Sequence, residues 1–207
     1  MATQKARREQ TRQSILDAAC ELFEQRGYDE TSVDEIVKFA DVAKGTFFRY
    51  FPTKLDVLVA VSRQAAKGDG EKLLVQVQAA EDGLQAVETI MRFFCAWFEK
   101  NRSLAIPVIQ HAATGFLQGV EHDTPSASTR ALLTAAFERA QALGQVRTDV
   151  KPRRLAEMLS GISAQAIKLW AHTAGTRRAW PWVRQYLDVF LHGALKQAGP
   201  ARKGRRG

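Results

Sequence analysis

Apolar residues recur at every third or fourth position along most of this 207-residue chain, which is the spacing of one face of an α-helix. No stretch shows the sustained apolar–polar alternation that a half-buried strand requires. The sequence therefore predicts an all-α protein of about nine to ten helices. The first apolar run consists of Ile15, Leu16, Ala19, Cys20, Leu22 and Phe23.

Short helices and tight turns are expected directly after this run. Gly27 ends the first helix as its C-terminal cap, and residues 32–35 read Ser-Val-Asp-Glu, a capping box that begins a second helix. Asp41 tolerates the left-handed backbone of a tight turn, and a third helix is expected over residues 44–51. Residues 53–56 form a second capping box and begin a fourth helix. Three helices with such a turn between the last two are a helix-turn-helix pattern.

From residue 68, Gly68, Gly70 and Gly83 are expected to interrupt short helical pieces, and the longer helical segments that follow predict a second, larger domain. We expect a helix-turn-helix domain over residues 1–53 and a helical domain over residues 54–198, with the boundary inside the fourth helix. Residues 199–207 form a basic tail that is expected to be disordered, and it either touches nucleic acid or only solubilises the chain. The longer helices are expected over residues 84–100, 103–118, 126–143, 152–173 and 179–197.

Composition excludes several classes of protein. Hydrophobic residues make up 45% and charged residues 25% of the chain, the range of an ordinary globular protein. The densest apolar patch, residues 57–61, is far shorter than the roughly 18 residues of a membrane span, so no membrane partner is expected. Cys20 and Cys95 fit core thiols in a reducing cytoplasm. Because no metal-binding spacing of Cys and His is present, we expect no metal and no cofactor.

The net charge of +8 is unevenly distributed along the chain. Residues 1–60 carry nine Lys and Arg against ten Asp and Glu, whereas residues 196–207 carry five basic residues and no acid. Within the first sixty residues the basic side chains are nevertheless clustered, and such clusters mark where a phosphate can dock. The clusters are Lys5, Arg7, Arg8 and Arg12 around Glu9, and Lys44, Arg49 and Lys54.

No motif in the sequence nominates an enzyme. The chain lacks a glycine-rich phosphate loop, a Glu-x-x-His pair and a Gly-x-Ser-x-Gly elbow. We therefore expect a protein without catalytic residues. The alternative from a different class is a helical enzyme or adaptor that uses the larger domain alone.

The third helix has the features needed to read DNA. A helix enters the major groove, which is about 12 Å wide, when its exposed N-terminal face is small or polar. Lys44, Gly45 and Thr46 supply a charge, a position without a side chain and a hydroxyl. Arg49 lies one turn further on, and Tyr50 presents a hydroxyl to a phosphate.

Two further helix starts are expected to flank this reading helix. Thr31 and Ser32 precede the second helix, while Thr53 and Lys54 precede the fourth. Backbone N–H groups at a helix start attract phosphate, and phosphate contacts fix the register on the duplex. The alternative is that residues 44–54 form a solvated corner of a helical bundle.

The last two expected helices carry long apolar seams, spaced as in helices that pack along one another. Small residues, Gly161 and Gly193, would let two helices approach closely. Two interpretations stay open: a core within one chain, or a two-fold interface between two copies. The seam residues are Leu155, Leu159, Ile162, Ala166 and Leu169 in one helix, and Val183, Leu187, Phe190 and Ala194 in the other.

An ordered series of short motifs lies between residues 11 and 58, and with them this segment strongly resembles the DNA-binding domain of the tetracycline-repressor (TetR) family of transcriptional regulators. The resemblance implies that the remaining residues form a ligand pocket and a dimer interface, with the last two helices in a four-helix bundle across a two-fold axis. The motifs are Thr-Arg-x-x-Ile-Leu-Asp-Ala-Ala from Thr11, Leu22-Phe23, Arg26-Gly27-Tyr28, Thr31-Ser32-Val33, Ile36, Lys44-Gly45-Thr46, Tyr50-Phe51 and Lys54.

The resemblance implies that Lys44, Gly45 and Thr46 open the recognition helix and that Tyr50 and Lys54 hold phosphates. The chain departs from the family at Asp41, which replaces the usual Gly, at Ala43, which replaces Ser and removes a side-chain helix cap worth about 1 kcal/mol, and at Phe48, which replaces Tyr. The ring of Phe48 can still touch a thymine methyl or a sugar. The expected DNA-binding residues are Thr31, Ser32, Lys44, Gly45, Thr46, Phe48, Arg49, Tyr50 and Lys54.

The resemblance further implies a small molecule that changes the spacing of two reading heads through the fourth helix. If the aromatic residues of the larger domain line a cavity, they favour a largely apolar ligand, although an aromatic stripe at helical spacing more often belongs to a plain core. We therefore expect a cytoplasmic, bacterial, homodimeric repressor that a small effector releases from a palindromic double-stranded operator. The alternative is a regulator of the same fold without an inducer, controlled by a protein partner. The expected ligand-binding residues are Phe94, Trp97, Phe98, Gln110, His111 and Phe116.

Overall fold

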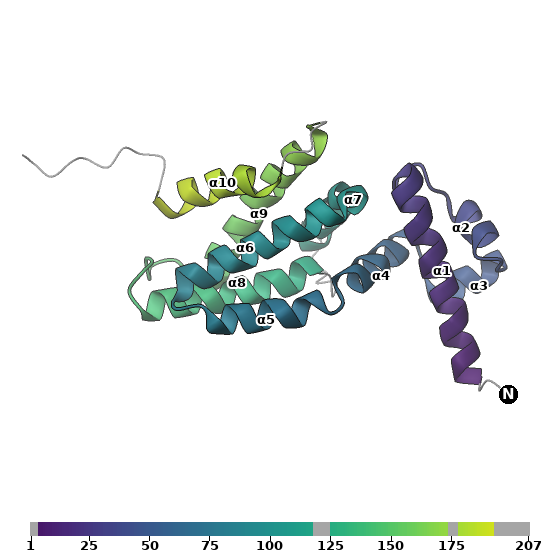
Figure 1. Ribbon diagram of the computed structural model, residues 1–207, viewed down its shortest axis with the longest axis horizontal. Helices are drawn as coiled ribbons and strands as arrows, with labels where there is room; N and C mark the ends of the chain where they lie inside the picture. The colour runs from purple at the N-terminus through teal and green to yellow at the C-terminus, as the bar shows by residue number, and fades with distance from the viewer. Residues whose placement is uncertain (1–3, 118–124, 174–177, 193–207) are drawn as a thin grey trace, which may run out of the picture.

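The computed structural model describes residues 4–117, 125–173 and 178–192. These residues form ten α-helices and no strand, which confirms the all-α prediction (Figure 1). The helices are α1 (Gln4–Arg26), α2 (Val33–Phe39), α3 (Lys44–Tyr50), α4 (Lys54–Ala66), α5 (Asp69–Ala79), α6 (Gly83–Lys100), α7 (Arg102–Leu117), α8 (Pro125–Ala142), α9 (Pro152–His172) and α10 (Trp180–His192).

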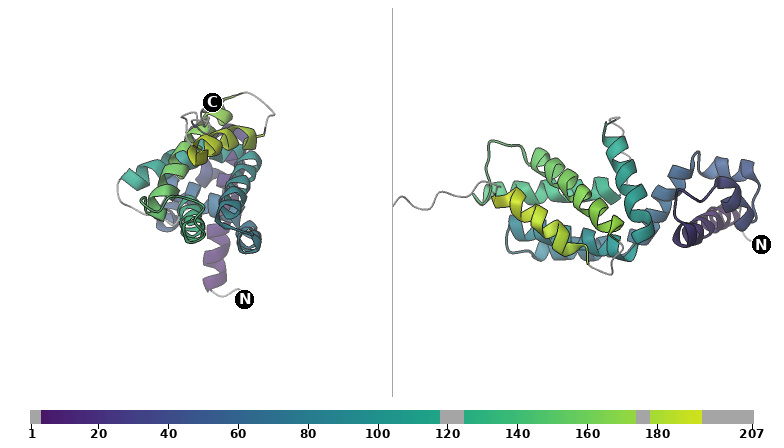
Figure 2. Two further views of the ribbon diagram at one scale, coloured as in Figure 1. Left: turned by 90° about the vertical axis from the view of Figure 1, so that its left-hand side faces the viewer. Right: turned by 90° about the horizontal axis from the view of Figure 1, so that it is seen from above.

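The helices gather into two groups joined by α4. Figures 1 and 2 show α1–α3 at one end of the molecule and α5–α10 at the other. Helix α4 packs against α1 of the first group and against α7 and α8 of the second. Its apolar residues Val57, Leu58 and Val61 are buried. The helix in which the sequence placed the domain boundary is thus in contact with both groups.

Local sequence signals determine where the N-terminal helices begin and end. Ser32 and Thr53 each form a complete capping box, with Glu35 and Asp56 respectively, as expected. Gly27 ends α1 with a positive φ of 85°, a conformation that costs little without a Cβ. Asp41 has a φ of 52° in the turn between α2 and α3, which confirms the expected left-handed residue there.

The structure differs from the sequence prediction at several glycines. Helix α5 is continuous over Asp69–Ala79, where only short helical pieces were expected, because Leu73 is buried where α5 packs on α6 and Gly70 is tolerated in its first turn. Gly161 lies on an exposed face of α9, and a Cβ built there meets nothing within 4 Å. It therefore makes no close helix crossing inside the chain, and Gly193 lies outside the described residues.

Helices α6, α8 and α9 form the centre of the larger group, with α10 packed on α9 and α6. Arg102 at the start of α7 donates to the carbonyls of Trp170, Ala171 and Thr173, and so ties α7 to the end of α9. None of the described helices is long and apolar enough to cross a bilayer. The largest fully buried side chains of this group include Ile90, Met91, Phe98, Leu133, Phe137, Leu159 and Trp170.

The closest backbone approach at a described glycine predicts a sensitive position. A Cβ built on Gly83, in the first turn of α6, would lie 2.3 Å from the backbone nitrogen of Ala140 in α8. Because backbone cannot yield as a side-chain tip can, Gly83→Ala should lower the free energy of unfolding by about 1–3 kcal/mol. Denaturant unfolding measures this change. Gly70→Ala, with open space around its Cβ, is the control and should not destabilise; an equally stable Gly83→Ala variant would contradict the prediction.

Candidate nucleic-acid interface

Helices α2 and α3 form a pair of seven-residue helices joined by a tight turn. The turn is closed by the backbone N–H of Val42, which donates to the carbonyl of Val37 at 3.0 Å. Ala43 caps α3 without a side-chain hydrogen bond, as its methyl group predicts. The N-terminal end of α3 therefore presents backbone and short side chains.

Aromatic side chains hold α3 from behind. Phe47 is fully buried and Phe51 nearly so, with their ring centroids 6.1 Å apart. The guanidinium of Arg12 lies 5.5 Å from the ring centroid of Phe51, which connects α1 to the end of α3. With this inner face fixed, the opposite face of α3 is left for a partner.

The outer face of α3 carries most of the predicted reading residues. Lys44, Gly45 and Arg49 are exposed, and 44% of Phe48 is accessible to solvent. A Cβ built on Gly45 meets nothing within 4 Å, so the backbone there is open to close approach. Thr46 and Tyr50 are half-buried. Sequence reasoning placed these six residues on one short helix, and the structure brings them together there.

Both cations of α3 already contact groups of the protein. The ammonium of Lys44 forms an ion pair of 2.7 Å with Asp34 on α2, and both side chains are more than half exposed. The guanidinium of Arg49 lies 5.3 Å from the ring centroid of Tyr50. Such exposed contacts are worth at most about 1 kcal/mol, so they leave both cations able to change partners.

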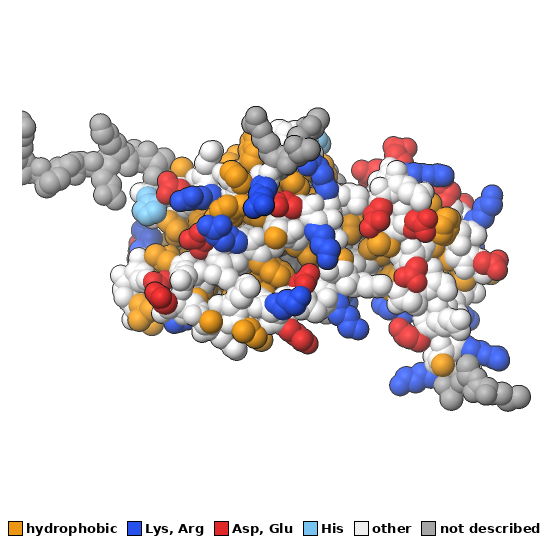
Figure 3. Space-filling view, in the orientation of Figure 1, with side chains coloured by type: hydrophobic (Ala, Val, Ile, Leu, Met, Phe, Trp, Pro, Cys, Tyr) orange, Lys and Arg blue, Asp and Glu red, His pale blue; other side chains and the backbone are white. Residues whose placement is uncertain are grey.

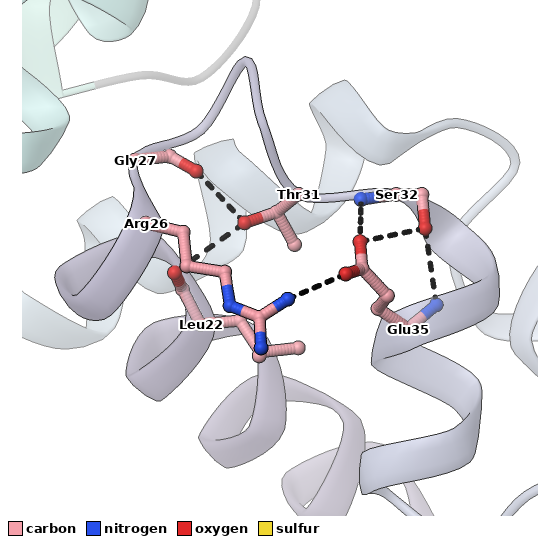
Figure 4. Close-up of polar contacts among 6 residues, drawn as sticks. All are labelled: Leu22, Arg26, Gly27, Thr31, Ser32 and Glu35. Carbon is pink, nitrogen blue, oxygen red and sulfur yellow. Dashed lines mark hydrogen bonds and ion pairs between the residues drawn. The ribbon is translucent and has the colours of Figure 1, made fainter.

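Thr31 is not placed for the DNA contact expected of it. Its side chain is only 1% exposed, and its hydroxyl contacts the carbonyl oxygens of Gly27 at 2.7 Å and Leu22 at 3.3 Å (Figure 4). This placement contradicts the expected phosphate contact, because a hydroxyl that joins the end of α1 to the start of α2 is unavailable to DNA. The sequence pattern gave the residue type but not its burial.

The capping boxes also alter the expected phosphate sites at the helix starts. The carboxylate of Glu35 accepts from the backbone N–H and the hydroxyl of Ser32, both at 2.8 Å (Figure 4). It also accepts from Arg26 at 2.6 Å, an ion pair that sequence reasoning missed. Asp56 holds the N–H and hydroxyl of Thr53 in the same way. Carboxylates thus already occupy both positions, although Ser32 remains exposed.

Lys54 also has partners other than those expected. Its ammonium donates to the carbonyls of Tyr28 and Thr31, both at 2.9 Å, and lies 3.5 Å from the carbonyl of Asp29. It also lies 4.2 Å from the ring centroid of Tyr28. Three carbonyls of the α1–α2 loop thus lie around the ammonium, so a phosphate contact would first have to displace them.

The first turns of α1 carry basic residues outside the predicted site. Lys5, Arg7 and Arg8 are exposed, and the first buried residue of the helix is Ile15. Figure 3 shows basic side chains on both sides of the protruding N-terminal end of α1. This end of the molecule therefore has a local excess of positive charge, as the clustering in the sequence predicted.

Comparison with known proteins identifies the family to which this arrangement belongs. Residues 15–61 match the family described as bacterial regulatory proteins, tetR family. The chain is 32% identical over 199 residues to the HTH-type transcriptional regulator AcrR of Shigella flexneri, a match that covers 90% of each protein. The chain belongs to the TetR family. It is accordingly a DNA-binding transcriptional regulator and not an enzyme, which confirms the sequence predictions on both points.

Solved structures of other transcriptional regulators share the fold. FadR of Thermus thermophilus, a transcriptional repressor in complex with lauroyl-CoA, has a TM-score of 0.70 at 24% identity, covering 93% of this chain and 100% of that one. FadR of Bacillus subtilis, in complex with stearoyl-CoA, has a TM-score of 0.63 at 16% identity, covering 88% of this chain and 99% of that one. At these identities the likeness establishes the fold.

The expected ligand residues of this TetR-family chain are placed unevenly. Trp97 and Phe98 on α6 are buried, with ring centroids 5.0 Å apart, and Phe94 is half-buried. Gln110 on α7 is exposed and His111 is half-buried, while the side chain of Phe116 lies outside the described part. A role for these residues in ligand binding stays a prediction.

Buried polar atoms without partners are a feature that sequence reasoning missed. Among the described residues, the indole nitrogen of Trp97 and the hydroxyls of Ser160 and Ser163 have no hydrogen-bond partner. Leaving such a group unsatisfied costs about 1–3 kcal/mol, so these atoms favour any partner that reaches them. The described residues contain no group of three His, Cys, Asp or Glu side chains able to hold a metal.

Most of the expected dimer seam lies inside a single chain. Leu155, Leu159, Ala166, Val183 and Leu187 are all buried here without a second copy, which contradicts their expected place in a dimer interface. Helical spacing marks an apolar stripe but does not indicate which neighbour covers it.

The remaining seam residues are less enclosed. Leu169 is 40% exposed, and Ile162 and Phe190 are partly buried. Phe190 packs against Phe137 of α8, with ring centroids 6.2 Å apart. Ala194 lies outside the described residues. An interface made by α9 and α10 with a second copy would therefore have to use their outer faces.

Protonation of Glu35 should weaken the N-terminal domain at acid pH. Hydrogen bonds from the backbone N–H and the hydroxyl of Ser32, together with the charge of Arg26, hold the pKa of this carboxyl below its ordinary value of 4.5. A lowered folded-state pKa adds stability above pH 4.5, and this stability is lost as the pH falls through the folded-state pKa.

Thermal midpoints of the wild type and Glu35→Gln measure this contribution. The variant should melt below the wild type at pH 6, and the gap should begin to close below pH 4.5 and vanish once the pH has fallen through the folded-state pKa of the carboxyl. Glu30→Gln, which removes a carboxylate of the α1–α2 loop outside the capping box, is the control. A gap that does not narrow as the pH is lowered from 6 through 4.5 would contradict the assignment.

Proposed function

We propose that this chain is a homodimeric repressor that binds a roughly palindromic operator and is released from it by a small, largely apolar ligand. The observation that carries the proposal is the exposed outer face of α3, where Lys44, Gly45 and Arg49 lie beside an accessible Phe48. A repressor of this kind acts in the cytoplasm, where it meets chromosomal DNA.

The outer residues of α3 divide by chemistry into two roles. Gly45, Thr46 and Phe48 present backbone, a hydroxyl and an apolar ring, groups that contact base edges and the thymine methyl. Lys44, Arg49 and Tyr50 present cations and a hydroxyl, which suit phosphates or guanine. Ser32, exposed at the start of α2, is the remaining phosphate contact of the proposal.

The second copy is proposed to pack on the outer faces of α9 and α10. Large apolar side chains are exposed there, with Met158 at 50%, Leu169 at 40% and Val189 at 52%. Ile162 lies one helical turn beyond Met158 and is partly exposed. An apolar stripe on two adjacent helices favours burial against the same stripe of a second copy, since a two-fold interface is self-complementary.

The part of the ligand that enters the larger domain is proposed to be an apolar acyl chain with a hydrogen-bonding group, as in an acyl thioester. Two structural neighbours contain lauroyl-CoA and stearoyl-CoA, which supports an acyl ligand. The aromatic residues Phe94, Trp97 and Phe98 favour an apolar chain. The unpaired indole nitrogen of Trp97 and the hydroxyl of Ser163 favour a ligand that brings a hydrogen-bonding partner.

Selection of bound duplexes from a random pool tests the DNA-binding proposal. Purified protein at physiological ionic strength should enrich one half-site in two inverted copies at a fixed spacing, because two identical heads are related by a two-fold axis. The enriched duplex should then be released by long-chain acyl-CoA but not by free coenzyme A. A pool without any sequence preference would contradict the proposed function, and release by coenzyme A alone would contradict the ligand class.

A charge placed on the proposed dimer face tests the second copy. Met158→Asp combined with Val189→Asp should convert the dimer to monomer in sedimentation, because each interface would then bury four carboxylates without partners. The affinity of the double variant for a duplex with two half-sites should fall as the dimer is lost. Val75→Asp, a change at a 65% exposed apolar residue of α5, is the control and should leave the dimer intact. A double variant that still sediments as a dimer would contradict this placement.

A further inference from the structure

We propose that Lys54 is a positioning residue that locks the start of α4 onto the α1–α2 loop and so fixes how the α2–α3 pair is held relative to the larger domain. This inference rests on the proposed function, since its consequence is the spacing of two reading heads. It gives Lys54 a different task from the phosphate contact that the family resemblance implies.

The contacts of the ammonium carry the first step. It lies 2.9 Å from the carbonyls of both Tyr28 and Thr31, 3.5 Å from that of Asp29, and over the ring of Tyr28. A lysine ammonium has three donors and no acceptor, so three converging carbonyls match it fully. Carbonyl oxygens that converge on one point repel one another unless a cation lies between them. The ammonium of Lys54 takes the place of that cation, in the way that rings of carbonyls surround an ion in a selectivity filter. Removing the charge therefore leaves the loop without its neutralising group.

The loop that Lys54 holds is itself firmly attached to both neighbouring helices. The Thr31 hydroxyl joins it to the carbonyls of Leu22 and Gly27 at the end of α1. The Glu35–Arg26 pair joins the start of α2 to the same end of α1 (Figure 4). A displacement of residues 28–31 is therefore expected to move α2 and, through the turn at Asp41, α3 as well.

Helix α4 also packs against the larger domain. Val57, Leu58 and Val61 are buried, and the helix packs against both α7 and α8. A helix behaves as a stiff rod, so a shift of α4 that starts at α7 or α8 moves Lys54 and, with it, the loop that it holds. Lys54 thereby connects the domain proposed to bind the ligand with the domain that reads DNA.

The chemistry of the side chain separates this role from a phosphate contact. A phosphate contact needs only a positive charge, which Arg supplies as well as Lys. The space at residue 54 suits a compact ammonium, since the nitrogen lies 2.9 Å from two carbonyls and 4.2 Å from the centroid of the Tyr28 ring, and the larger planar guanidinium would not fit the same position. Lys54→Arg should therefore behave like the charge-deleting Lys54→Met if Lys54 positions the loop, but like the wild type if it holds a phosphate.

Selection from a random pool with full-length Lys54→Met, Lys54→Arg and Lys44→Met gives the decisive comparison. Both Lys54 variants should return the wild-type half-site with a broadened range of spacings between the two copies. Affinity for the fixed-spacing duplex should fall about tenfold or more, while affinity for a single half-site changes little. Lys44→Met, the matched charge deletion on the exposed face of α3, should keep the wild-type spacing.

Salt dependence gives an independent readout of the same variants. Loss of one phosphate contact lowers the slope of log affinity against log salt by about 0.9 per subunit, which is expected for Lys44→Met. The Lys54 variants should bind more weakly than the wild type by the same factor at every salt concentration, so that their slope equals the wild-type slope. A reduced slope with unchanged spacing in Lys54→Met, restored in Lys54→Arg, would overturn the proposal in favour of a phosphate contact.

Hydrogen exchange keeps the inference testable even if the proposed function fails. If the wild type selects no duplex, the repressor proposal is lost, but the amides of residues 28–32 and 55–57 should still exchange about tenfold faster in Lys54→Met. Lys54→Arg keeps the charge and serves as a second variant should Lys54→Met fold poorly. Wild-type exchange rates in both Lys54 variants, with native helical content, would overturn the inference.

Discussion

Two seven-residue helices cannot hold themselves together in water, and the N-terminal domain depends on the contacts that hold α2 and α3 in place. The capping box of Ser32 and Glu35 supplies acceptors for backbone N–H groups that α2 alone would leave to solvent, whereas α3 begins at Ala43 without a side-chain cap. The buried rings of Phe47 and Phe51 fix α3 against the rest of the domain instead. Since packing of its inner face holds α3, its outer face is free to carry function.

The loop between α1 and α2 brings these contacts together at one place. Within six residues it ends a 23-residue helix, begins a short one, buries a threonine hydroxyl and receives an ammonium from α4. A segment with so many polar partners and so little regular structure is well suited to join rigid elements. Polar contacts at the helix ends therefore contribute more to the organisation of this small domain than a large core does.

Sequence reasoning recovered what is local and missed what depends on the neighbour in space. The capping boxes, the left-handed Asp41 and the outer face of α3 follow from residues a few positions apart, which the sequence displays directly. The partners of Lys54 lie more than twenty residues away, and the burial of Thr31 depends on how α1 and α2 meet. The same limit applies to Leu159 and Val183, whose helical spacing indicated an apolar stripe without indicating that the chain itself covers it.

The carboxylate of Asp34 already occupies Lys44, a cation proposed to contact DNA. A duplex that approaches α3 must offer a phosphate in exchange for a carboxylate already 2.7 Å away. An exposed ion pair is worth about 1 kcal/mol at most, so this exchange would weaken binding to a duplex by a factor of about five at most. In the proposed DNA complex, Asp34 therefore competes with the nucleic acid for the ammonium of Lys44.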